Sequence, residues 1–93
     1  MIKPTPVSTG VYYYLHTMKY LFKTVEVNHY GTASFEVFEK EDDVYLFMPV
    51  TYKGYGAKPS KLEIKIIKDR YISTPSNHPF QSNLVETLRL YLY

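Results

Sequence analysis

The strongest constraint on the fold is a strict alternation of apolar and charged residues in the segment 61–66, which reads KLEIKI. A period of two places the two kinds of side chain on opposite faces of a β-strand. The segment therefore predicts a strand with one buried and one solvated face. Lys68-Asp69 follow it and predict a turn into a short partner strand over residues 70–74.

A second hairpin is predicted upstream of this strand. The segment 34–39 (SFEVFE) alternates loosely, the polar residues 40–43 form a turn, and VYLFM follows at 44–48. Residues 28–32 (NHYGT) contain Asn and Gly, which tolerate a positive φ, and predict another turn. Pro49 and the Gly-, Pro- and Lys-rich residues 53–60 predict a break and a loop.

The N-terminal third supports two interpretations. Apolar residues recur at spacings of three and four from Val11 to Val25, which predicts a helix to about Lys23 and then a strand. The aromatic run Tyr12-Tyr13-Tyr14 and the β-branched residues near Val25 favour a strand instead. Both interpretations stay open for residues 11–16. Residues 1–8 contain two prolines and no periodicity, so we expect an extended arm.

A terminal helix is predicted near the C-terminus. Asn83 stands three residues before Glu86, which is the spacing of a capping box. The apolar face of this helix would consist of Leu84, Val85, Leu88, Tyr91 and Leu92. In a chain of 93 residues we expect one domain with an α+β fold, in which an antiparallel four- to five-stranded sheet is flanked by an N-terminal and a C-terminal helix.

Composition excludes several classes of protein. The chain contains no cysteine, which removes disulfides, thiolate metal sites and cysteine nucleophiles. The longest uncharged apolar stretch, residues 11–15, is far too short to cross a bilayer. No apolar stretch precedes Val11, which argues against a secretory signal. We expect a cytoplasmic protein without a membrane partner.

No catalytic or cofactor motif is complete. The segment 54–61 (GYGAKPSK) approaches both phosphate-binding patterns, but Pro59 stands where each requires glycine. Glu26 and His29 have the Glu-x-x-His spacing of carboxylate-bridged metal sites, but the required second copy is missing. The adjacent carboxylates of residues 41–43 fall in a solvated turn, where general acid-base catalysis lacks a buried partner. We therefore predict a protein that is not an enzyme and has no metal or cofactor.

Charge and aromatic residues indicate candidate binding surfaces. Residues 36–43 hold five acidic side chains and one lysine, a net −4, whereas residues 53–70 hold six basic and two acidic side chains, a net +4. The basic segment also carries tyrosines, a combination that single-stranded nucleic acid binders use. The predicted partner-binding residues are Tyr52, Lys53, Tyr55, Lys58, Lys61, Lys65, Arg70 and Tyr71. The predicted acidic patch is Glu36, Glu39, Glu41, Asp42 and Asp43.

The chain is also rich in tyrosine, with 11 Tyr and 5 Phe, which is more aromatic surface than a small core easily buries. Tyrosine is enriched at protein interfaces, so our leading hypothesis is a non-enzymatic protein-binding module. The bias towards AT-rich codons suggests a phage or mobile-element protein that inhibits a host protein by surface occlusion. The alternative is a single-stranded nucleic acid or RNA binder that uses segment 52–71. Self-association into a homo-oligomer stays open.

Overall fold

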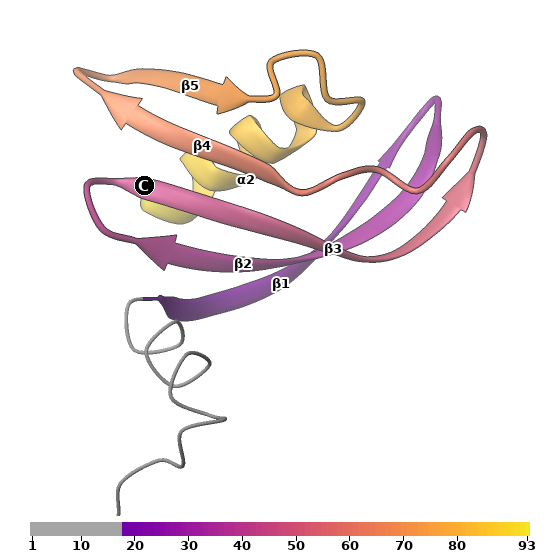
Figure 1. Cartoon of the computed structure of the whole chain (residues 1–93), viewed down its shortest axis with the longest axis horizontal. Coiled ribbons are helices and arrows are strands. Elements are labelled where there is room, and N and C mark those ends of the chain that lie inside the picture. The colour runs from indigo at the N-terminus through magenta and orange to yellow at the C-terminus, as the bar shows by residue number, and fades with distance from the viewer. Residues whose placement is uncertain (1–17) are drawn as a thin grey trace, which may run out of the picture.

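The computed structural model describes residues 18–93, which form a five-stranded antiparallel meander followed by one helix (Figure 1). The elements are β1 (Lys19–Asn28), β2 (Gly31–Lys40), β3 (Val44–Gly54), β4 (Leu62–Ile67), β5 (Arg70–Thr74) and α2 (Gln81–Leu92). The spatial order of the strands equals their chain order. The predicted antiparallel sheet with a C-terminal helix is confirmed. The predicted arm 1–8 and the ambiguous residues 11–16 lie outside the described residues.

The prediction of helix up to Lys23 is wrong for residues 19–23, which belong to strand β1. The pairing of β1 with β2 is interrupted by a bulge between Tyr20 and Phe22. Leu21 and Phe22 consequently both pack against the core, although they are neighbours in sequence. A bulge breaks the period of two, so the apolar spacing resembled that of a helix.

Strand β3 is longer than predicted and continues through Pro49 to Gly54. The register with β2 shifts here, since Ser34 pairs with Thr51 but Phe35 pairs with Pro49, and Val50 is the extra residue. Proline donates no backbone hydrogen bond and is tolerated in a sheet at such a bulge. The break predicted at Pro49 is therefore a bulge within a continuous strand.

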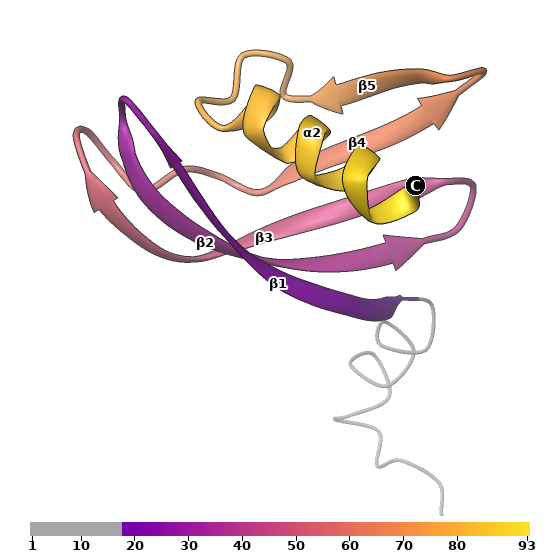
Figure 2. The ribbon, with the colours of Figure 1, turned by 180° about the vertical axis from the view of Figure 1, so that it is seen from behind.

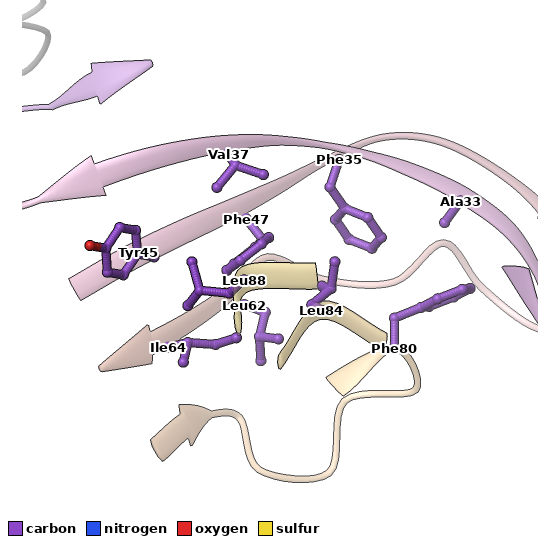
Figure 3. Close-up of a cluster of buried hydrophobic side chains, with 10 residues drawn as sticks. All are labelled: Ala33, Phe35, Val37, Tyr45, Phe47, Leu62, Ile64, Phe80, Leu84 and Leu88. Carbon is purple, nitrogen blue, oxygen red and sulfur yellow. The ribbon is translucent and has the colours of Figure 1, made fainter. Parts of the chain in front are cut away.

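Helix α2 covers one face of the sheet (Figure 2). The side chains between helix and sheet form a cluster in which strands β2, β3 and β4 and the helix all take part (Figure 3). The cluster consists of Ala33, Phe35, Val37, Tyr45, Phe47, Leu62, Ile64, Phe80, Leu84 and Leu88. Alternation along each strand sends these residues to the helix side. The strand residues that alternate with them point to the opposite face.

The start of α2 differs from the predicted capping box. The helix begins at Gln81, and Phe80 holds the N-cap position without a side-chain hydrogen bond. Asn83 accepts a hydrogen bond from Asn28 Nδ2 at 3.0 Å and donates one to the Val27 carbonyl at 3.2 Å. The capping prediction is wrong because Asn83 bonds to strand β1 instead of its own helix. Of the predicted apolar face, Leu84 and Leu88 are buried, whereas Tyr91 and Leu92 are exposed.

A buried carboxylate fastens α2 to strand β1. Glu26 is largely buried on the helix side, and its Oε2 accepts hydrogen bonds from Thr24 Oγ1 at 2.7 Å and Thr87 Oγ1 at 2.6 Å. Buried carboxylates need such donors to replace lost water. Thr87 belongs to α2, so this bond joins two elements that are far apart in the sequence. Glu26 therefore holds α2 against β1 through the hydroxyl of Thr87.

Candidate functional site

The sheet face opposite α2 has no covering element among the described residues and is here named the open face. It is defined by alternation from the core residues: Phe35 and Val37 point to the helix, so Phe38 points away. The same parity holds along the other strands. The open face consists of exposed Tyr20, Val25, Val27, Ile67 and Ile72, together with Phe38, Val44, Leu46 and Met48.

The open face has a packed apolar centre. Tyr20 on β1 is in register with Phe38 on β2, and the two rings meet edge to face with centroids 5.5 Å apart. Phe38 is in register with Leu46 on β3. Leu46 is only 3% exposed although it lies outside the core cluster, and Phe38 and Glu63 are its register neighbours on either side. The open face thus carries an apolar row of Tyr20, Phe38 and Leu46. The solvent-facing side of an antiparallel sheet commonly has polar residues instead.

Charged side chains border this row. Lys40 Nζ lies 2.9 Å from Glu63 Oε2 and joins β2 to β4 across β3. Lys23 is in register with Glu36. Lys65 is in register with Val44 on one side and with Ile72 on the other. The border therefore contains two pairs of oppositely charged side chains, Lys40 with Glu63 and Lys23 with Glu36. It also contains Lys65, which lies between two apolar side chains.

The structure does not bring the eight predicted partner-binding residues together. Lys53 ends β3, and Tyr55 and Lys58 lie in the loop that follows. Lys65 and Arg70 lie at the other end of the sheet, beside the β4–β5 turn (Figure 1). Lys61 directly precedes β4 between these two groups.

Two of the predicted binding tyrosines instead face the helix side. Tyr52 packs against the core, with its ring edge to face with Phe80 at 6.2 Å. Tyr71 also packs against the core, and the Arg89 guanidinium lies 5.8 Å from its ring centroid. Both residues are half-buried, so their role here is packing.

The acidic residues are likewise divided. Glu36 lies on the open face, whereas Glu39 lies on the helix side opposite Tyr45. Burial, followed by the charges of Glu39 and Asp43, raises the pKa of the Tyr45 hydroxyl. The Asp43 carbonyl accepts a hydrogen bond from the Ile66 amide at 3.1 Å, so the acidic turn lies beside the end of β4. The acidic turn and the basic residues near Arg70 are neighbours at one end of the sheet.

Backbone geometry accounts for the acidic turn itself. Asp42 and Asp43 both have a positive φ, of 63° and 59°. Aspartate adopts this left-handed conformation more readily than most residues because its short side chain bonds locally. Glu41, Asp42 and Asp43 thus fit the needs of a tight turn.

An aromatic and basic tip forms at the far end of the sheet. It consists of His29, Tyr30, Lys53 and Tyr55. Lys58 follows in the loop, where its Nζ donates a hydrogen bond to the Val50 carbonyl at 3.2 Å. The Tyr55 amide donates a hydrogen bond to the Tyr30 carbonyl at 2.9 Å, and the Tyr52 hydroxyl lies within hydrogen-bond distance of the carbonyls of both. The rings of His29 and Tyr30 lie 4.2 Å apart. Sequence reasoning missed Tyr30, because only the pairing of β2 with β3 brings it to Tyr55.

His78 is buried and fastens the 55–61 loop to the segment before α2. Its Nδ1 accepts a hydrogen bond from the Phe80 amide at 3.0 Å, so the proton of the neutral ring is on Nε2, which donates to the Ser60 carbonyl at 2.7 Å. Burial lowers the pKa of His78 below its ordinary value of 6.5, although the Ser60 contact opposes this shift. The neutral ring therefore stabilises the loop next to the tip.

This arrangement predicts a pH dependence. Below pH 6.5 the unfolded chain protonates His78 while the folded chain resists, so the free energy of unfolding should fall as the pH drops from about 6.5 to the lowered folded pKa. Above pH 7 this contribution is complete. Urea unfolding of the protein and of His78→Asn, whose amide oxygen can accept the Phe80 bond without titrating, would measure it. A slope in this window that is equal in both proteins would contradict the prediction.

No family model, curated protein or solved structure matches this chain. Within residues 18–93, no helix is long and apolar enough to cross a membrane. In the same part of the chain, no three histidine or carboxylate side chains gather as a metal site would require.

Proposed function

We propose that this protein is a protein-binding module without catalytic activity and that its partner docks on the open face. One observation carries the proposal: large apolar side chains stand exposed around a packed apolar row on a face that α2 leaves uncovered. Contiguous apolar patches bordered by polar residues mark interaction surfaces in soluble proteins. The charged side chains at the border supply orientation more than affinity.

The chemistry of the face indicates what kind of surface fits it. The centre of a matching partner surface is apolar and relatively flat, since it covers Tyr20, Phe38 and Ile72. Its border carries a carboxylate opposite Lys65. This protein would inhibit such a partner by covering its surface, without a chemical reaction on the partner. A phage or mobile-element origin, a host protein as the partner and a cytoplasmic location stay predictions from composition.

Two tyrosines provide a matched test of this proposal. Tyr20 lies on the open face, and Tyr55 is 79% exposed at the tip, so the same substitution probes two places. Tyr20→Ser should weaken partner binding at least about tenfold, because interface tyrosines commonly contribute roughly 2 kcal/mol. Tyr55→Ser should leave binding unchanged. The measurement is recovery of proteins from a host extract by each immobilised variant, followed by titration of the recovered partner.

The outcomes of this comparison separate the surfaces. Equal recovery by the protein and both variants would place the contact elsewhere and contradict the proposal. Loss with Tyr55→Ser alone would assign binding to the tip. Near-UV circular dichroism of each variant checks that the fold is intact.

A second function, binding of single-stranded nucleic acid, is supported by the composition of the tip. Tyr30 and Tyr55 are exposed aromatic residues held together by their backbones, and Lys53 lies at the end of β3, two residues before Tyr55. Aromatic rings stack on bases while lysines contact phosphates. Only part of the basic segment proposed from sequence takes part in this tip, because Lys65 and Arg70 lie at the opposite end.

Titration of labelled oligonucleotides at two salt concentrations tests this second function. Phosphate contacts make such binding weaker at high salt. Tyr55→Ser should reduce binding at low salt, whereas Tyr20→Ser should not. Absence of binding at low salt would exclude the tip as a nucleic acid site.

A further inference from the structure

The outer edge of strand β1 has no strand paired with it in the described part of the chain, residues 18–93. Among the described residues β1 lies at the margin of the sheet and pairs with β2 alone. It is ten residues long, whereas the opposite margin, β5, has five. An edge strand exposes a row of backbone donors and acceptors that another strand can complete. The length of β1 makes it the stronger of the two edges for pairing.

The direction of its backbone groups follows from two contacts. Asn28 pairs with Gly31 across a two-residue turn, so the backbone groups of Asn28 point towards β2. The Val27 carbonyl accepts a hydrogen bond from Asn83 of α2, so it points away from β2. Because the direction alternates along a strand, the N–H and C=O groups of Val25 and Lys23 also point outward. Helix α2 bonds to the backbone of this edge at Val27, and its Thr87 and Tyr91 contact the helix-side side chains of Glu26 and Phe22.

The side chains of this segment suit strand pairing. Val25 and Val27 are 63% and 65% exposed, and β-branched residues favour a paired strand. No proline interrupts β1. Natural edge strands commonly avoid association by shortness, proline, bulges or charge. Here the bulge lies at Tyr20 to Phe22, and Lys23 is the charged side chain in the outward-pointing stretch that follows.

We propose that two copies of this chain associate by antiparallel pairing of their β1 strands around Val25, which joins both sheets into one. The segment is self-complementary about this point. A two-fold axis at Val25 sets it against Val25 of the second copy and sets Lys23 against Val27 of the second copy. There the Val27 N–H donates to the Lys23 carbonyl, while the Val27 carbonyl keeps its hydrogen bond from Asn83. On the helix side, Thr24 faces Glu26 of the second copy. No like charges meet between residues 23 and 27, which is why a second copy is the fitting occupant.

Substitution of Val25 by proline tests the pairing directly. Proline removes an N–H that points outward, so the ladder with β2 keeps its hydrogen bonds while the intermolecular ladder loses a symmetric pair. Val25→Thr is the matched control, because threonine keeps both the β-branch and the N–H. In analytical ultracentrifugation of the full chain over a dilution series, the protein and Val25→Thr should form dimers, and Val25→Pro should dimerise at least about tenfold more weakly.

Hydrogen exchange of the unmodified protein provides a second measurement that does not depend on the folding of a variant. The amides of Lys23 and Val25 should exchange slowly at high protein concentration and faster on dilution, because pairing with the second copy covers them. A protein that stays monomeric, a dimer in which these amides exchange fast, or a dimer that survives Val25→Pro would overturn the proposal. The pairing is independent of the proposed partner binding, since Tyr20→Ser tests the open face and should leave the dimer intact.

Discussion

Replacement of Gly31 by alanine should lower the free energy of unfolding by about 3 kcal/mol or more. A Cβ on Gly31 would lie 2.4 Å from the Lys53 carbonyl oxygen and 2.7 Å from the Gly54 Cα, both of which are backbone atoms. Its φ of +152° adds strain for any residue with a side chain. The two glycines face each other in register, so strands β2 and β3 approach closely where the tip begins.

Gly56→Ala separates the two causes of this loss. Gly56 also has a positive φ, of +73°, but a Cβ there meets nothing within 4 Å. We expect a loss of roughly 1 kcal/mol from the backbone conformation alone. Urea unfolding of both variants measures the difference. Equal losses would show that the close contact at Gly31 relaxes without cost and would contradict the prediction.

The second large effect is expected at Phe80. This side chain is fully buried directly before α2, and its ring packs against Phe35, Tyr52 and His78 with centroids 5.7, 6.2 and 6.4 Å away. Truncation of a buried phenylalanine to alanine typically costs about 3–5 kcal/mol. Phe80→Ala should therefore strongly destabilise the fold and loosen the contact between α2 and the sheet.

Phe80→Leu is the control for this variant, because leucine fills most of the space and should cost about 1 kcal/mol. Thermal unfolding followed by circular dichroism compares the two. If Phe80→Ala and Phe80→Leu lose the same stability, the cavity left by the ring is not what destabilises the protein.

Local patterns in the sequence predicted much of the fold because they reflect local geometry. The alternation in residues 61–66 predicted β4, and Lys68-Asp69 predicted its turn, where both residues have a positive φ. The bulge between Tyr20 and Phe22 lets two neighbouring side chains, Leu21 and Phe22, face the core. The apolar residues there consequently have a helix-like spacing, and the sequence prediction of a helix was wrong. Asn83 matched a capping pattern, but its best hydrogen-bond partners lay on β1.

The candidate surfaces were less predictable than the fold. Lys53 and Arg70 were grouped by their closeness in the sequence, yet the meander places them at opposite ends of the sheet. Tyr52 and Tyr71 were assigned to a binding surface, but the register sends both to the helix side. The open face was not predicted as a unit. Its members come from all five strands and share only their direction.

The sequence by itself determined the antiparallel sheet and the C-terminal helix, because period and turn chemistry act between near neighbours. Only the tertiary structure decided which side chains share a surface, since strand register and the single helix on one face set this over long distances. The alternation at residues 61–66 illustrates the difference between these local and long-range determinants. It determined that Leu62 and Lys65 face opposite ways, while the packing of α2 decided that the side of Lys65 is the open face.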